Sequence, residues 1–479
     1  MLNPADLFHQ NRQTNWLLVD RALGWGRDQI SPSQQLVDRV QRRLDQLHNS
    51  AVSSRPLKIL LVQSDPIEFL ADFLAAEIGQ HHLFLANPSW RQQEWQQVCS
   101  LVKPDQIWGE ELPGLADFEP APLINSNHGN EPAQILIPTG GSSGKIRFAI
   151  HTWETLTASV EGCQRYFKLE KINCCCVLPL YHVSGLMQFI RAFQSGGELF
   201  ISSFKQLLND LETQSLQTNF ADFFLSLVPT QLQQLLQIPS AISWLQQFKA
   251  VLIGGGPTWP DLLEQARVLK IPLAPTYGMT ETAAQIATLK PSAFLTGKSG
   301  YTVLPHARVR ICNAEGEPLS RGQTGKITVE TPALALGYYP EQFKDAPPHL
   351  ITDDLGWLDA WGTLHLVGRS SEKIITGGEN VFPIEVEAAI RQTGLVRDVC
   401  VLGLPDCQWG EVVTAVYVPV QPDLSVSSLQ AAIATQLSKY KQPKRWIPLT
   451  TLPRNNQGKI NRPQLLATLV QDHNGGATL

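Results

Sequence analysis

Apolar residues recur at helical and at strand spacing in turn along much of the chain. They predict a helix over 33–47, a strand over 59–62, a helix from the N-cap Asp65 to Gly79 and a strand over 82–85. The alternation continues in predicted helices over 153–166 and 184–193 and predicted strands over 174–178, 198–201 and 250–253. Such repeated units indicate an α/β fold of mainly parallel, helix-covered sheets, with the ligand at the strand ends.

The pattern changes after residue 300. Short strands separated by turns, such as 307–311 and 326–330, predict a small β-rich subdomain over about 300–367. A mixed α+β unit follows, with predicted helices over 383–390 and near 429–437 and predicted strands around Val399 and Val416. We therefore expect a domain boundary near 368–372.

Composition favours a small-molecule substrate. The 479 residues, 43% of them hydrophobic, exceed one ordinary domain, and the formal net charge is −5. No long Lys/Arg run offers a surface to nucleic acid or to an anionic membrane. Residues 1–20 lack a leader pattern and no apolar run approaches the roughly 20 residues of a membrane span. We expect no stable membrane insertion and a cytoplasmic location, and leave the oligomeric state open.

The eight cysteines include no C-x-x-C pair, which argues against a zinc site or a disulfide framework. Cys174, Cys175 and Cys176 lie in a short apolar run. Cysteine behaves there as a small hydrophobic residue, so we interpret the triplet as part of a buried strand.

A loop of small residues follows the strand-like segment 135–137. It contains Thr139, Gly140, Gly141, Ser142, Ser143, Gly144 and Lys145. Glycines allow close approach of the backbone, hydroxyls donate hydrogen bonds and the lysine adds charge, a combination suited to a polyphosphate. It is not a Walker A loop, because Thr139 and Ile146 stand where glycine and Ser or Thr are required. Taken alone, it is also compatible with a flexible linker.

Four further segments have candidate nucleotide chemistry. They are, first, Tyr277, Gly278, Thr280 and Glu281 in 276–282, preceded at a strand end by Gly254, Gly255, Gly256 and Pro257; second, Asp354 in 352–356; third, 368–387; and fourth, Lys459 in 456–460. A glycine-rich strand end and a tyrosine can flank a planar base, a glutamate suits Mg2+, and an aspartate can accept from ribose hydroxyls. Each segment alone is also compatible with an ordinary turn, and Lys459 alone with a solvated lysine.

In this order and spacing, the segments resemble the adenylate-forming superfamily of acyl-CoA synthetases, luciferases and adenylation domains, from about Leu136 to Arg462. The resemblance implies ATP, Mg2+ and coenzyme A as cofactor and co-substrates, and a carboxylic acid as substrate. By resemblance, 139–145 handles the ATP phosphates, 254–257 and Tyr277 flank adenine, and Thr280 with Glu281 serves phosphate and metal. The resemblance further assigns Asp354 and Arg369 to ribose, and Lys459 to the bridge between carboxylate and α-phosphate.

The same resemblance implies a mobile C-terminal domain. It assigns 1–368 to an N-terminal adenylate-forming domain, 369–371 with Ser371 to a hinge, and 372–479 to the C-terminal domain that carries Lys459. In family members that domain turns between the half-reactions and brings the segment of Gly377 and Gly378 to the thiol tunnel. Ser371 departs from the usual Asp or Lys, and Ile146-Arg147-Phe148 departs from the usual Pro-Lys-Gly.

The compact length and the segment 182–185 resemble o-succinylbenzoate–CoA ligase of naphthoquinone biosynthesis. By this resemblance His182 gates the carboxylate site, Ser184 lines the acyl pocket and Arg191 binds a second carboxylate, which a guanidinium can do with two parallel hydrogen bonds. Arg191 on a solvated helix face is the alternative interpretation. The loop 140–148 also looks like the cyanobacterial and plant-type branch, which would make phylloquinone rather than menaquinone.

Other functions stay open on sequence alone. The acid could be a different acyl or aryl acid, or the acceptor could be a carrier protein instead of coenzyme A. A third possibility is a silent nucleotide or acyl sensor on the same fold, although Lys459, Glu281, Asp354 and Arg369 are all present.

Overall fold

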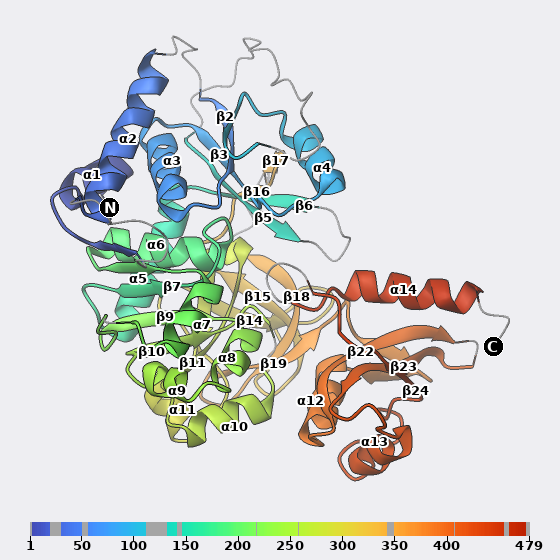
Figure 1. Cartoon of the computed structure of the whole chain (residues 1–479). Coiled ribbons are helices and arrows are strands. Elements are labelled where there is room, and N and C mark those ends of the chain that lie inside the picture. Colours follow the sequence, from blue (N-terminus) through green and yellow to red (C-terminus); the bar gives the residue numbers. More distant parts are fainter. Residues whose placement is uncertain are drawn as a thin grey trace.

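Two mixed sheets form the centre of a large N-terminal domain, beside which a small C-terminal domain lies (Figure 1). The computed structural model describes residues 2–19, 30–49, 56–111, 132–140, 146–216, 218–256, 258–342, 349–406, 408–454 and 459–475. The predicted α/β class, with a large domain followed by a small one, is confirmed.

The first sheet has a parallel body and an antiparallel edge. In spatial order its described strands are β1 (Leu17–Val19), β8 (Leu199–Ile201), β7 (Asn173–Cys176), β9 (Phe223–Leu227), β10 (Ala250–Ile253), β11 (Leu273–Met279), β12 (Ala284–Thr288) and β13 (Thr302–Val303). Pairing is parallel from β1 to β11 and antiparallel from β11 to β13.

The second sheet is built in the same way. In spatial order its described strands are β17 (Glu341–Gln342), β16 (Gly337–Tyr338), β6 (Ile146–His151), β5 (Ile135–Gly140), β3 (His82–Ala86), β2 (Lys58–Val62) and β4 (Gln106–Gly109). The strands β5, β3, β2 and β4 are parallel, whereas β5, β6, β16 and β17 pair antiparallel.

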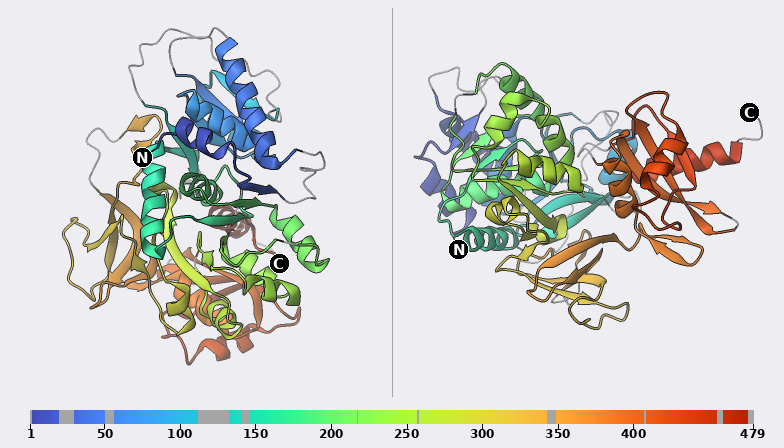
Figure 2. Two further views of the ribbon diagram at one scale, coloured as in Figure 1. Left: turned by 90° about the vertical axis from the view of Figure 1, so that its left-hand side faces the viewer. Right: turned by 90° about the horizontal axis from the view of Figure 1, so that it is seen from below.

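Helices cover both faces of the two sheets (Figures 1 and 2). Those described in the N-terminal domain are α1 (Pro4–Asn11), α2 (Pro32–Asn49), α3 (Pro66–Ile78), α4 (Gln92–Val102), α5 (Trp153–Phe167), α6 (Val183–Ser195), α7 (Phe204–Glu212), α8 (Pro229–Leu235), α9 (Pro239–Leu245), α10 (Pro260–Val268), α11 (Pro291–Leu295) and the 3-10 helix η2 (Thr280–Thr282). One continuous core joins α3, α5 and α6 to facing strands of both sheets. Among the described residues, no helix is long and apolar enough to cross a bilayer.

Alternating side chains explain the apolar runs of the central strands. In β7, Cys174 and Cys176 enter the core between the sheets, and Cys175 points into the core on the opposite face. A strand covered on both faces needs apolar residues at every position. The interpretation of the triplet as a buried strand is confirmed, although the strand predicted to reach residue 178 ends at Cys176.

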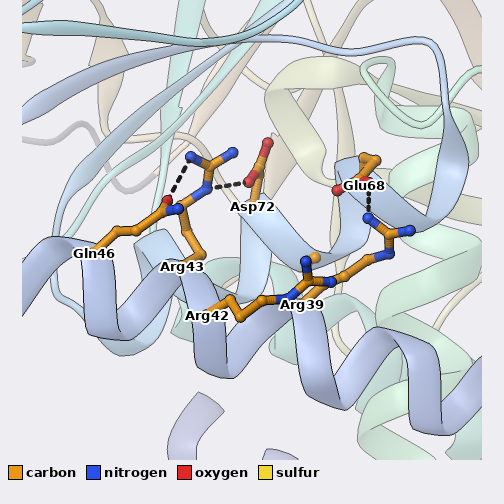
Figure 3. A pocket seen from close by; sticks show the side chains of 7 residues that line it. Arg39, Arg42, Arg43, Gln46, Glu68 and Asp72 are labelled. Atoms are coloured by element: carbon orange, nitrogen blue, oxygen red, sulfur yellow. Dashed lines mark hydrogen bonds and ion pairs between the residues drawn. The ribbon is translucent and has the colours of Figure 1, made fainter.

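Ion pairs attach α2 to α3 beside a pocket of about 110 Å³ (Figure 3). Arg39 pairs with Glu68, and Arg43 Nε lies 2.6 Å from Asp72 Oδ1. Asp72 is buried, and burial raises its pKa while Arg43 opposes the rise. Arg43 thus supplies the countercharge for a carboxylate that α3 carries into the interior.

The β-rich subdomain is a third, antiparallel sheet of β14 (Arg308–Cys312), β15 (Gly325–Glu330), β18 (Leu350–Leu358) and β19 (Leu364–Arg369). The C-terminal sheet contains β21 (Glu379–Val381), β20 (Ile374–Thr376), β23 (Gly410–Pro419), β22 (Val396–Asp406) and β24 (Arg445–Pro448). On one face it carries α12 (Pro383–Gln392) and α13 (Val426–Ile433), and on the other α14 (Arg462–Gly475). The helix predicted near 429–437 begins earlier, because Ser425 caps it by accepting from the backbone N–H of Ser428.

Candidate functional site

The predicted phosphate loop connects two antiparallel strands. β5 and β6 form a hairpin that pairs from Ile135 with His151 to Gly140 with Ile146. Thr139 and Gly140 are the last residues of β5. Gly141, Ser142, Ser143, Gly144 and Lys145 lie outside the described residues.

Glu281 lies next to this hairpin, in the 3-10 turn that follows β11. Its Oε1 accepts a hydrogen bond from the Tyr338 hydroxyl at 2.7 Å and a longer one from Thr139 Oγ1 at 3.5 Å. The backbone N–H of Ala335 donates to the Glu281 carbonyl at 2.8 Å. His151 Nε2 lies 2.8 Å from the Thr280 carbonyl oxygen and so joins β6 to the same turn. Two segments far apart in sequence thus hold the carboxylate, and the contacts of Ala335 and His151 hold the turn that carries it.

The Glu281 carboxylate is the kind of oxygen ligand that Mg2+ binds in a nucleotide site. In the part of the chain that is described, no group of three or more His, Cys, Asp and Glu side chains is arranged for a metal. Mg2+ is commonly held by one or two carboxylates together with substrate phosphates and water, so a single glutamate beside a phosphate loop is adequate.

The glycines after β10 allow the ends of β10 and β11 to approach each other. A Cβ on Gly254 would lie 2.9 Å from Thr276 Cγ2, and Gly255 has a φ of +77°. A Cβ on Gly278 would lie 1.8 Å from the Ala284 carbonyl oxygen, so glycine is required where β11 and β12 pair irregularly. Gly256 has open space around its Cα, and Pro257 lies outside the described residues.

Asp354 connects two other predicted residues. Its Oδ2 accepts from the Tyr277 hydroxyl at 2.8 Å, and its Oδ1 accepts from Arg369 Nε at 3.2 Å. Burial, followed by the Asp354 charge, raises the pKa of Tyr277, which keeps the phenol protonated and donating. Each carboxylate oxygen has a second lone pair, so Asp354 can also accept from ribose hydroxyls.

Lys459 reaches this cluster from the C-terminal domain. Its Cε is 3.8 Å from the position that a Cβ on Gly255 would occupy. Partial removal of the ammonium from water and the charge of Arg369 lower its pKa, while Asp354 and Glu281 act to raise it. The predicted lysine and the predicted carboxylates therefore lie within electrostatic range of one another.

His182 lies at the N-terminus of α6, close enough to Lys459 to respond to its charge. Burial and then the Lys459 charge lower the pKa of His182 to about 4, so the imidazole is neutral at physiological pH. The rings of Tyr181 and His182 are in contact, with centroids 4.6 Å apart. Ser184, in the first turn of α6, is exposed, and its carbonyl accepts from Gln188.

Arg191 is buried, with 4% of its surface exposed, which contradicts the solvated-face interpretation. Its Nη2 donates to Gln285 Oε1 at 3.4 Å, and no described carboxylate lies within ion-pair distance. Arg191 Nε, Gln285 Nε2, Gln188 Oε1 and both ring nitrogens of His306 are buried without a hydrogen-bond partner among the described residues. Buried polar atoms are nearly always paired, so this cluster fits a polar ligand group.

Ser371, which the sequence predicts as the hinge, is held by the Asp353 carboxylate. Both the backbone N–H and the hydroxyl of Ser371 donate to the Asp353 side chain, and the Ser370 N–H donates to the Asp353 carbonyl at 2.8 Å. The neutral Ser371 thus faces a negative charge supplied by β18. This contact was not predicted from the sequence.

Gly377 and Gly378 form the two-residue turn between β20 and β21. Their φ values are +58° and +85°, which only glycine adopts at low cost in such a turn. The Gly377 N–H donates to the Trp409 carbonyl at 2.9 Å, within the C-terminal domain. The turn itself explains both glycines, and their approach to a thiol stays a prediction.

A second contact between the domains involves an aromatic ring. The guanidinium carbon of Arg391, on α12, lies 4.8 Å from the ring centroid of Trp259, which precedes α10. Arg391 also pairs with Asp398 at 3.1 Å. Such cation–π contacts stabilise modestly, and this one favours the orientation in which Lys459 faces Glu281.

Sequence reasoning missed several residues around the site. Tyr338, His151, Gln285 and His306 carried no motif signal, although a histidine ending the apolar strand 146–151 is a noticeable polar exception. Arg147, noted only as a departure, places its guanidinium carbon 4.1 Å from the ring centroid of Tyr338.

Comparison with known proteins identifies the family of the chain. The family model of the AMP-binding enzyme matches residues 56–339, and that of the AMP-binding enzyme C-terminal domain matches residues 385–459. A 2-succinylbenzoate–CoA ligase of Enterococcus faecalis is 31% identical over 80% of this chain and 81% of its own length. One of Listeria monocytogenes is 29% identical over 90% of this chain and 93% of its own.

Solved structures resemble the whole chain. Bacillus subtilis o-succinylbenzoate CoA synthetase (MenE) in complex with the acyl-adenylate intermediate OSB-AMP has a TM-score of 0.78 and 24% identity, over 96% of this chain and 97% of that one. The same protein in complex with ATP and magnesium ion has a TM-score of 0.75 and 25% identity, over 96% and 98%. With its motifs, its fold and its relatives in agreement, the chain belongs to the AMP-binding enzyme family.

Proposed function

We propose that this protein is an ATP-dependent 2-succinylbenzoate–CoA ligase, which forms an acyl-adenylate and then a coenzyme A thioester. The family membership supports the adenylating chemistry, and the relatives of that name support the acid. The observation that carries the choice of acid is Arg191, a buried guanidinium with no carboxylate at ion-pair distance among the described residues. A dicarboxylic acid supplies the missing countercharge with one carboxylate while the other is activated.

In the first half-reaction a substrate carboxylate oxygen attacks the α-phosphorus and pyrophosphate leaves. Thr139 and the loop after it would hold the phosphates, and Asp354 with Arg369 the ribose. Glu281 would hold Mg2+, which offsets phosphate charge when bound. Lys459 would stabilise the negative charge that develops between carboxylate and α-phosphate, and its position beside Gly255 fits this role. Neutral His182 would border the reacting carboxylate without repelling Lys459.

In the second half-reaction the thiol displaces AMP. Lys459 would then withdraw from its position beside Gly255, which it reaches from the C-terminal domain. We propose that the chain turns at Ser371, which requires breaking its bonds to Asp353, and that the turn of Gly377 and Gly378 then approaches the thiol. The corresponding boundaries are 1–368, 369–371 and 372–479.

The location of the enzyme and the pathway of its product also belong to this proposal. A cytoplasmic site and a product leading to phylloquinone or menaquinone are what the sequence predicts. Fractionation of the source cells and quinone analysis of a deletion strain test them.

The decisive experiment is thioester formation by the purified full-length protein with ATP, Mg2+ and coenzyme A. We compare 2-succinylbenzoate with benzoate, coumarate and medium-chain fatty acids. Clear preference for 2-succinylbenzoate is the expected result. Preference for a monocarboxylate would refute the role of Arg191 and leave the chemistry intact, and pyrophosphate release without thioester would point to a carrier-protein acceptor.

A further inference from the structure

Tyr338 makes the shortest side-chain hydrogen bond to Glu281 among the described residues, at 2.7 Å. It lies on β16, a two-residue strand that pairs with β6 through Tyr338 and Ala149. The antiparallel edge of the second sheet therefore carries this hydroxyl to the end of β11, where Glu281 lies. Among the described residues, two side chains donate to the carboxylate, Tyr338 and Thr139, and both donate to Oε1.

The ring of Tyr338 is held in turn by Arg147. The guanidinium lies over the ring face at 4.1 Å from its centroid, in the strand that follows the phosphate loop. Burial and the Glu281 charge raise the pKa of Tyr338, and Arg147 opposes the rise. The hydroxyl therefore keeps its proton and donates it in the hydrogen bond to Glu281 Oε1.

A carboxylate with one oxygen fixed presents its other oxygen in a defined direction. Hydrogen bonds of this kind orient metal-binding carboxylates in many proteins, and their loss typically lowers metal affinity or activity about 10–100-fold. Without the hydroxyl, the Glu281 side chain would sample other rotamers before each metal encounter.

We propose that Tyr338 is a positioning residue that orients Glu281 toward the Mg2+ of the nucleotide, with Arg147 fixing its ring. This inference rests on the proposed function, because it takes Glu281 as the metal ligand. It concerns the adenylation half-reaction alone, since the thioester half-reaction consumes the adenylate without Mg-ATP.

The test is Tyr338→Phe in the full-length protein, which removes the hydroxyl and keeps the ring under Arg147. The readout is acid-dependent pyrophosphate release as a function of free Mg2+ at saturating acid. We expect the half-saturating Mg2+ concentration to rise roughly tenfold. Thioester formation from preformed acyl-adenylate should stay at the wild-type rate.

Tyr339→Phe is the matched control. Tyr339 is the next residue, is also half-buried, and its hydroxyl has no hydrogen-bond partner among the described residues. Pyrophosphate release by Tyr339→Phe should depend on Mg2+ in the same way as release by the wild type. If Tyr338→Phe has the same Mg2+ dependence as Tyr339→Phe, or slows both half-reactions equally, the inference is wrong.

A double substitution separates positioning from a general structural effect. If Tyr338 acts through Glu281, adding Tyr338→Phe to Glu281→Gln should change the residual adenylation rate less than twofold, because the oriented carboxylate is already lost. Multiplicative losses would overturn the inference. Absence of acid-dependent pyrophosphate release from the wild type would instead overturn the proposed function.

Discussion

Replacing Arg191 with methionine is expected to weaken binding of the acid and to leave the fold intact. The change removes the charge and keeps an unbranched side chain of similar reach. Truncating one partner of a buried hydrogen-bonded charge pair costs about 2–5 kcal/mol. Because Arg191 is 4% exposed, water cannot replace the lost contact. A loss of about 3 kcal/mol of binding free energy, in the middle of this range, corresponds to a rise in KM for the acid on the order of a hundredfold.

Arg191→Met is expected to weaken binding of the acid without lowering the free energy of unfolding. In the free protein the described surroundings of Arg191 provide an amide at 3.4 Å and no carboxylate, so its burial is uncompensated. Removing an uncompensated buried charge leaves the free energy of unfolding unchanged or increases it. Denaturant melts of wild type and Arg191→Met measure this directly.

The assay is acid-dependent pyrophosphate release, with KM determined separately for 2-succinylbenzoate and for ATP. Arg165→Met is the control, because Arg165 is an exposed arginine on the neighbouring helix α5, paired with Glu161 at 3.0 Å. A hundredfold rise confined to the acid supports the reasoning. An equal rise for ATP, or a loss of more than about 2 kcal/mol of stability, would return Arg191 to a structural role.

Two further predictions concern other buried or interdomain charges. Lys459→Ala should abolish most acid-dependent pyrophosphate release while thioester formation from preformed adenylate survives; equal loss of both would refute its assignment. Burial, and then the Glu154 charge, raises the pKa of Glu77 to about 8. The folded protein therefore holds this proton more tightly than the unfolded chain. The stability that the protonated form contributes is complete below pH 4.5 and is lost as the pH rises toward 8. Glu77→Gln should therefore match the wild type in urea melts at pH 4.5 and exceed it at pH 8.5, and a constant difference between the two would contradict this.

The motifs predicted the family and the α/β fold, and both are confirmed. The central strands could be predicted because they are covered on both faces, as β7 is, and so appear as apolar runs. Helix starts could be predicted where a capping residue such as Asp65 marks them. The predicted ends of helices were wrong where a local hydrogen bond sets the end, as at the cap Ser425 before α13.

The site could be predicted only where residues belong to motifs. The motif residues Asp354 and Arg369 contact each other, whereas the hydroxyl closest to Glu281 comes from a strand with no signal of its own. Tyr338 reaches Glu281 through the pairing of a two-residue strand, and spacing along the chain cannot reveal such a contact. The burial of Arg191 likewise depends on how α6 faces β12, which the sequence left open between two interpretations.

Because Lys459 lies near the C-terminal end of the sequence, it is synthesised after the other residues proposed for the site. The elements that carry Thr139, Glu281 and Asp354 emerge from the ribosome before the C-terminal domain, and domains generally fold as units during synthesis. A nascent or truncated chain that ends before residue 459 would possess the residues proposed for the nucleotide and the acid, and would lack Lys459, the residue proposed for adenylation. We expect a chain truncated before residue 459 to bind ATP without acid-dependent pyrophosphate release, which binding and release assays on that chain would test.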